Sequence, residues 1–160
     1  MDKMEIYHYL SERNIAYETM EHKAVYNMEE LAAVELPHSE CYAKNLFVRD
    51  DKKRKYYLIT VMGKKRVDLK EFRKQHGLRA LSFASEEELR TILGLTPGSV
   101  SPFGILNDIG GVVHFYLDES FRDGNIAVHP NDNTATVWLS ANSLMKLIKE
   151  HGNIAEFAKI

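Results

Sequence analysis

The segment from Thr96 to Gly104 is the part of this chain best suited to bind a carbonyl oxygen or an anion. It reads Thr-Pro-Gly-Ser-Val-Ser-Pro-Phe-Gly, so two prolines and two glycines hold a loop of small side chains. Gly98 can adopt a positive φ and the flanking prolines fix φ, so we expect the next three amides to converge on one point. The candidate carbonyl-binding residues are Gly98, Ser99, Val100 and Ser101. A rigid connector after a helix is the alternative interpretation.

Lys44 and Asn45 interrupt an apolar and aromatic run, residues 42–48, that is typical of a β-strand. Side chains alternate on a strand, so the two residues face opposite sides of the sheet. A lysine beside a cleft can hold a phosphate or a polarised oxygen, whereas an ordinary edge-strand lysine discourages aggregation. His129 precedes Pro130 at the end of another strand, where it is either a pocket wall or a turn residue.

Motifs of several common catalytic classes do not occur in the sequence. It has no nucleophile elbow, no GxxxxGK phosphate loop, no GxGxxG and no HExxH. Cys41 is the one cysteine, and we interpret it as a small core or surface thiol and not as a nucleophile. The seven histidines are scattered without metal-ligand spacing. We therefore expect no metal site and no cofactor.

The length and composition predict one compact domain over residues 1–160. No apolar run approaches the roughly 18 residues that span a bilayer, and the first residues lack the order of a signal peptide. We expect a cytoplasmic protein that does not bind membranes, and a lone free thiol fits a reducing compartment.

The net charge of −2 argues against uniform attraction to nucleic acid, but the positive residues are clustered. Such runs are most often solvated hairpin tips, yet two runs that flank one strand are suited to bind phosphates. The first cluster is Lys52, Lys53, Arg54 and Lys55, and the second is Lys64, Lys65 and Arg66.

Periodicity and capping residues predict an α+β domain with a mixed, largely antiparallel sheet of at least five strands flanked by helices. Helices are expected where Asp2, Asn27, Asp68, Ser85 or Ser140 caps an amphipathic segment, ending near residues 14, 34, 77, 94 and 152. Strands are expected at residues 15–19, 42–48, 56–62, 112–117, 125–129 and 134–139, the second and third forming an antiparallel hairpin.

Taken in order, these segments resemble the YbaK/prolyl-tRNA editing domain family, in particular its free-standing Ala-tRNA(Pro) deacylases. The resemblance covers nearly the whole chain. It rests on His22-Lys-Ala-Val-Tyr26, Ala43-Lys-Asn-Leu-Phe47, Lys65-Arg-Val-Asp-Leu69, Leu93 to Gly104 with its GxxxP signature, and His129-Pro-Asn-Asp-Asn133.

The resemblance implies a hydrolase that cleaves the ester between an amino acid and tRNA, most closely the ester of alanine on tRNA(Pro). The lysine matching Lys44 is the residue most tied to activity, and the loop meets the substrate carbonyl. The residues matching Asn45 and His129 define the aminoacyl pocket, and we add Pro102 and Phe103 as candidate pocket residues. Prolyl-tRNA synthetase is an implied partner. Deacylases of cysteinyl or other small aminoacyl-tRNAs share the lysine and loop, and a non-catalytic tRNA-binding module is the alternative from another class.

A physical argument accompanies the resemblance. Alanine is smaller than proline, so a synthetase pocket built for proline cannot exclude it sterically, and roughly 1–3 kcal/mol per methylene limits discrimination. A second, smaller pocket solves this problem. We hypothesise that loop amides stabilise the oxyanion, that Lys44 holds the charged RNA end or the ester, and that a water assisted by the ribose hydroxyl attacks. No residue is assigned as general base.

Overall fold

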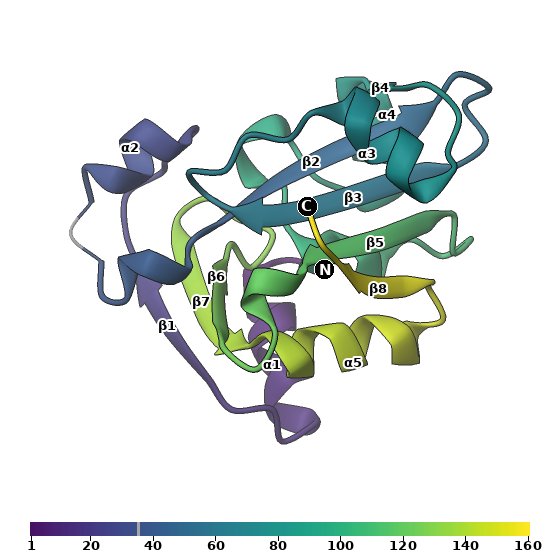
Figure 1. Cartoon of the computed structure of the whole chain (residues 1–160). Helices are drawn as coiled ribbons and strands as arrows, with labels where there is room; N and C mark the ends of the chain where they lie inside the picture. The colour runs from purple at the N-terminus through teal and green to yellow at the C-terminus, as the bar shows by residue number, and fades with distance from the viewer. Residues whose placement is uncertain (35) are drawn as a thin grey trace.

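The computed structural model describes residues 1–34 and 36–160, which form two β-sheets with helices packed around them (Figure 1). The larger sheet is mixed, in the order β4-β2-β3-β5-β8, and the smaller is antiparallel, in the order β1-β7-β6. The strands are β1 (Tyr17–Glu21), β2 (Ala43–Asp50), β3 (Tyr56–Met62), β4 (Leu81–Phe83), β5 (Val113–Asp118), β6 (Asn125–Val128), β7 (Ala135–Ser140) and β8 (Ala155–Ala158). The α+β class and the mixed sheet are as predicted.

Capping residues set the helix starts as expected. The helices are α1 (Lys3–Glu12), α2 (Met28–Ala32), α3 (Leu69–His76), α4 (Glu86–Leu93) and α5 (Ala141–His151). Each expected N-cap side chain accepts a hydrogen bond from a first-turn amide, because these amides have no partner within the helix. Gly77, Gly94 and Gly152 end α3, α4 and α5 in the left-handed conformation. The second helix is shorter than predicted, ending at Ala32.

The hairpin β2–β3 is the element that positions most of the candidate site. Its strands pair antiparallel, with Asn45 opposite Thr60, and the polar segment 51–55 forms the turn. β5 then pairs parallel to β3, and β8 parallel to β5. The short strands β4 and β8 were not predicted, because each gains its partners only from tertiary contact with the sheet edge.

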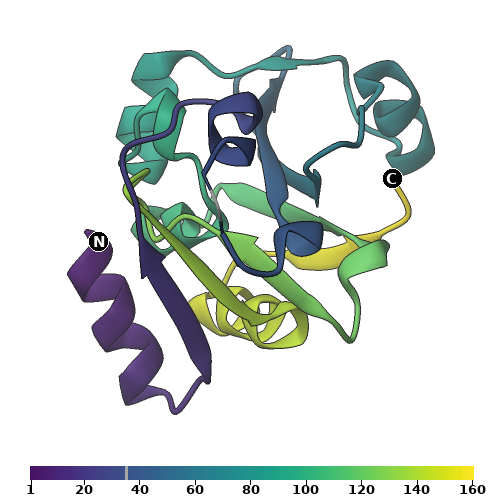
Figure 2. The same cartoon turned by 90° about the vertical axis from the view of Figure 1, so that its left-hand side faces the viewer.

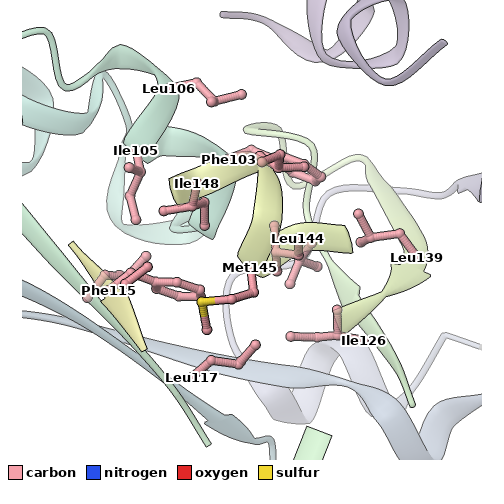
Figure 3. Packing of buried hydrophobic residues seen from close by; sticks show 14 of the residues in the cluster. Phe103, Ile105, Leu106, Phe115, Leu117, Ile126, Leu139, Leu144, Met145 and Ile148 are labelled. Atoms are coloured by element: carbon pink, nitrogen blue, oxygen red, sulfur yellow. The ribbon is translucent and has the colours of Figure 1, made fainter. Parts of the chain in front are cut away.

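Both faces of the larger sheet are buried, and alternation along the strands decides which side chain goes where. Phe47, Leu58 and Phe115 face the main core, which contains the buried side of α5 (Figure 3). Their neighbours Val48 and Tyr57 face a second core that includes Phe72 of α3. Figure 2 shows α1 beside β1, which is an edge strand of the smaller sheet. Burial on both faces makes the hairpin a rigid support for residues at its open end.

One contact joins the two sheets beside the candidate site. Tyr42, just before β2, forms a parallel bridge with Ala127 of β6. Two residues further along each strand, this alignment brings His129 beside Lys44. The bridge therefore explains how residues 85 positions apart in the chain come together, which no local sequence pattern could predict.

Candidate active site

A pocket of about 170 Å³ lies where the start of β2, the loop after α4 and the segment before α2 meet. Five of the predicted site residues line it, together with residues that were not predicted. The lining residues are Val25, Tyr26, Asn27, Met28, Leu31, Ala43, Lys44, Asn45, Pro97, Gly98, Val100 and His129. The pocket is smaller than the roughly 300–1,000 Å³ of sites for drug-sized ligands, so it suits a small group.

The carboxamide of Asn45 is held in one orientation. Its Oδ1 accepts a hydrogen bond of 2.6 Å from the hydroxyl of Thr60, and its Nδ2 donates to the carbonyl of Val100 at 3.3 Å. Thr60 is fully buried. Because the carbonyl of Val100 can only accept, the nitrogen of Asn45 must face it, and the hydroxyl of Thr60 then donates to the amide oxygen. Asn45 thereby ties the loop to the sheet and keeps one N–H for a ligand.

The ammonium of Lys44 donates a hydrogen bond to the main-chain carbonyl of Lys65, just after β3. No carboxylate in the part of the chain that the structure describes pairs with Lys44. Lys65 itself forms an ion pair of 2.7 Å with Asp118, which is almost completely buried. The side chain of Lys44 is thus fixed at the pocket, and since no carboxylate among the described residues neutralises it, its ammonium can bind an anion or a polarised oxygen.

His129 is held in a defined tautomer. Its Nδ1 lies 2.9 Å from the carbonyl oxygen of Ala135, which can only accept, so Nδ1 carries the proton and Nε2 is an acceptor. Burial lowers the pKa of His129, against the opposing effect of this hydrogen bond, and the neighbouring His22 lowers it further. A neutral imidazole thus forms one wall of the pocket.

The ring of His22 lies next to the ring of His129. The two ring centroids are 6.2 Å apart. The Nδ1 of His22 lies 2.8 Å from the carbonyl of Lys23, and its Nε2 lies 2.9 Å from the hydroxyl of buried Thr136. Because a carbonyl only accepts, Nδ1 of His22 donates to Lys23, and the Thr136 hydroxyl is the partner of Nε2. His22 does not line the pocket, and we interpret it as a support for its wall.

The conformation predicted for Gly98 is wrong. Residues Pro97–Ser99 form a short 3₁₀ turn, and Gly98 is not among the glycines with positive φ. Its lack of a side chain matters for space instead. A Cβ at this position would lie 2.8 Å from Cδ1 of Tyr26 and 3.2 Å from Nδ2 of Asn133. Only glycine therefore lets the aromatic ring rest on the loop at the pocket rim.

The loop amides do not all converge as predicted. The amide of Ser99 donates to the carbonyl of Thr96 at 3.0 Å and so is used within the turn. The amides of Val100 and Ser101 have no acceptor among the described residues. Ser101 is fully buried, however, and its hydroxyl accepts from the amide of Phe103. Of these positions, only Gly98 and Val100 line the pocket.

Two predicted pocket residues lie in the core. Pro102 and Phe103 begin the 3₁₀ helix of residues 102–107, and both are buried. Phe103 packs in the main hydrophobic cluster, and neither residue lines the pocket. The buried turn anchors the carboxyl end of the loop, because a fully buried aromatic side chain resists movement of its backbone.

The two basic clusters lie at opposite ends of β3, so they do not form the single patch expected from their flanking positions. Lys52, Lys53, Arg54 and Lys55 belong to the hairpin turn, before β3. Lys64, Lys65 and Arg66 follow β3 at the end where Lys44 lies. A strand rises about 3.3 Å per residue, so the seven residues of β3 separate the clusters by roughly 20 Å. Only the second cluster adjoins the candidate site.

Sequence reasoning missed the wall of the pocket formed by residues 25–31. Val25 is anchored to Asn133 by hydrogen bonds in both directions, and Met28 and Leu31 lie on α2. The helical spacing of Met28 and Leu31 indicates one apolar face, but it gives no sign that this face borders a ligand site.

Two further classes of site find no support in residues 1–34 and 36–160. None of the helices there is both long and apolar enough to cross a bilayer. That part of the chain also contains no group of three histidine, cysteine or acidic side chains placed to share a metal ion.

Comparisons with known proteins show the family and the fold of this chain. Residues 22–147 match the family described as the aminoacyl-tRNA editing domain. The prolyl-tRNA editing protein ProX of Acetoanaerobium sticklandii is 43% identical over 145 residues, 90% of this chain and 88% of the relative. Prolyl-tRNA synthetase associated domain-containing protein 1 of Bos taurus is 32% identical, covering 87% and 84%. The crystal structure of a candidate trans-editing enzyme for prolyl-tRNA synthetase has a TM-score of 0.73 at 24% identity, covering 98% of this chain and 94% of that one.

Proposed function

Because this chain belongs to the aminoacyl-tRNA editing domain family, we propose that it removes alanine wrongly attached to tRNA(Pro) by hydrolysing the ester bond. The family and the relative named as a prolyl-tRNA editing protein identify the chain as an aminoacyl-tRNA deacylase. The proposal adds the amino acid, the tRNA and the roles of individual residues. We also propose that residues 1–160 act as one editing domain, and that prolyl-tRNA synthetase is a partner.

The observation that carries the proposal is the meeting of Lys44, Asn45, Gly98 and His129 around one pocket of about 170 Å³. In this proposal the walls of the pocket leave room for a methyl side chain and clash with a pyrrolidine ring, which makes it the second, smaller sieve that proline editing requires. The fixed carboxamide of Asn45 and the neutral ring of His129 form walls that cannot easily move apart.

Catalysis in this proposal rests on stabilising the oxyanion of the ester. The amide of Val100 has no acceptor among the described residues, and Val100 lines the pocket. One well-placed donor of this kind is worth on the order of 3 kcal/mol. Lys44 adds a positive charge toward the RNA end of the substrate, and a water assisted by the ribose hydroxyl is the nucleophile. Ser99 and Ser101 support the loop and take no part in the chemistry.

A panel of charged tRNAs tests the proposal. Purified protein should release alanine from Ala-tRNA(Pro) and leave Pro-tRNA(Pro) intact, with Cys-tRNA(Pro) and other small aminoacyl-tRNAs measured beside them. Lys44→Ala should lower kcat/KM by roughly a hundredfold or more. Lys146→Ala is the matched control, since Lys146 is an exposed lysine on α5 that does not line this pocket. Faster release of cysteine than of alanine would reassign the amino acid, and binding without release would refute hydrolysis.

A further inference from the structure

Tyr26 is an exposed aromatic residue at the rim of the pocket. Its side chain is 69% exposed, although burial of an aromatic ring is usually favourable. The ring lies directly against Gly98, where a Cβ would come within 2.8 Å of Cδ1. One part of the ring is thus covered by the loop and the rest faces solvent beside the opening.

The backbone beneath this ring is fixed by its neighbours. Val25 donates to the carbonyl of Asn133 at 3.2 Å, and Nδ2 of Asn133 donates back to the carbonyl of Val25 at 2.8 Å. The amide of Tyr26 donates to the carboxylate of Glu30 at 2.6 Å. These three hydrogen bonds hold the backbone that carries the ring, so little conformational freedom of this segment is lost when a flat partner binds.

The size of the pocket requires a second contact area for the substrate. About 170 Å³ accommodates a small acyl group but not a nucleoside as well. In an aminoacyl ester of RNA, the ribose joins the acyl group directly to a terminal base. That base must therefore lie just outside the rim, where Tyr26 is exposed.

We propose that Tyr26 is the stacking platform for the unpaired terminal base of the RNA whose ester enters the pocket. The inference rests on the proposed function for the identity of that RNA. Every base has a π-face, so stacking on tyrosine binds the end of the strand without reading its sequence. Lys64 and Arg66, which follow β3 beside Lys44, supply positive charge for the adjoining phosphates.

One other exposed aromatic residue competes for this role. Phe83 in β4 is 61% exposed and lines a neighbouring hollow on the other side of the Asn45–Val100 hydrogen bond. Phe83→Ala is therefore the matched control, because it removes an equally exposed ring from the adjacent surface. Tyr26→Leu is the second control, since it keeps an apolar side chain over Gly98 without an aromatic face.

A pair of small substrates isolates the contribution of the base. Wild-type protein should hydrolyse 2′(3′)-O-alanyl-adenosine with a kcat/KM about tenfold or more above that of the alanyl ester of 1-O-methylribose. Tyr26→Ala and Tyr26→Leu should abolish this preference, mainly through KM. Tyr26→Phe and Tyr26→Trp should retain it, and Phe83→Ala should leave it unchanged. Loss of the preference in Phe83→Ala, or its persistence in Tyr26→Ala, would overturn the proposal.

Binding of an unacylated strand separates this inference from the deacylase activity. The trinucleotide CCA carries no aminoacyl ester, so its Kd, measured by NMR titration, does not depend on deacylation. Tyr26→Ala should weaken its binding about tenfold, while Phe83→Ala leaves the Kd unchanged. If no charged tRNA is hydrolysed but this difference is found, the proposed function fails and the stacking site stands. If Ala-tRNA(Pro) is hydrolysed but neither the trinucleotide nor the base preference responds to Tyr26, the stacking site alone is refuted.

Discussion

The hydroxyl of Thr60 donates a 2.6 Å hydrogen bond to Oδ1 of Asn45, its direct partner across the β2–β3 hairpin. This contact comes from a fully buried side chain and holds the Asn45 carboxamide in place, while the carbonyl of Val100, which can only accept, fixes which end of the carboxamide faces it. One pocket wall is therefore held in position by a residue that does not itself line the pocket.

Replacing Thr60 by valine, which has nearly the same shape, should release the Asn45 side chain. We expect a loss of about 1–2 kcal/mol in the free energy of unfolding, because the partly buried carboxamide oxygen of Asn45 loses its donor. Hydrolysis of Pro-tRNA(Pro) should rise relative to Ala-tRNA(Pro), measured as a ratio of kcat/KM values. Thr60→Ser keeps the hydroxyl and should preserve both properties. An unchanged ratio in Thr60→Val would show that the orientation of Asn45 does not set selectivity.

Gly98→Ala should disturb the pocket rim without straining the backbone. Gly98 does not have positive φ, so alanine can adopt its conformation, but the new methyl group would contact the ring of Tyr26. We expect activity to fall while the free energy of unfolding changes by less than about 1 kcal/mol. In a Tyr26→Ala background the same substitution should have much less effect, since the ring is gone. A double-mutant cycle measures this coupling, and fully additive losses would contradict it.

The basic clusters should differ in their contribution to RNA binding. Lys64→Ala and Arg66→Ala should each reduce the slope of log K against log salt by roughly 0.7 for the unpaired CCA end. Substitutions at Lys52 or Lys53 should not alter that slope, because the hairpin turn lies about 20 Å away along β3. Fluorescence anisotropy at several salt concentrations measures the slopes. Equal effects of both clusters on CCA binding would show that the strand follows a different path.

His129 should titrate below pH 6.5. Burial lowers the pKa of this ring, the Ala135 hydrogen bond opposes the shift, and His22 adds to it. The folded state then binds the proton more weakly than the unfolded state. The neutral ring therefore contributes its full share to the free energy of unfolding above about pH 6.5, and this contribution is lost as the pH falls through the lowered pKa. The ring resonances followed by NMR give the midpoint and separate it from His114, whose pKa is also lowered. A midpoint above pH 6.5 would contradict the neutral wall.

Glu88 joins α4 to Arg49 and Tyr56, and these contacts should stabilise the fold down to low pH. Burial alone would raise the pKa of Glu88, but hydrogen bonds from Ser85, Tyr56 and Arg49 outweigh it and lower the pKa to about 2. This stability is present above pH 4.5 and is lost as the pH falls toward 2. Glu88→Gln should cost about 2 kcal/mol at pH 7. Denaturant unfolding at several pH values should show the difference from wild type narrowing below pH 4, and a constant difference would argue against the charged network.

Local chemistry along the chain was sufficient to determine the helix starts, the β2–β3 hairpin and the α+β class. Caps such as Asp68 and Ser85 act within one helical turn, and the hairpin joins two adjacent segments, so each depends on contacts that are short in sequence. The sequence also identified Lys44, Asn45, Gly98 and His129, which meet at one pocket.

Only the tertiary structure decided how those residues are used. The Tyr42–Ala127 bridge brings His129 to the hairpin, and the ring of Tyr26 explains why position 98 lacks a side chain. Phe103 turned out to be a core residue, because its loop closes onto the main hydrophobic cluster. Each of these contacts joins segments far apart in the chain, and their register depends on the packing of the whole domain, which no local pattern of residues encodes.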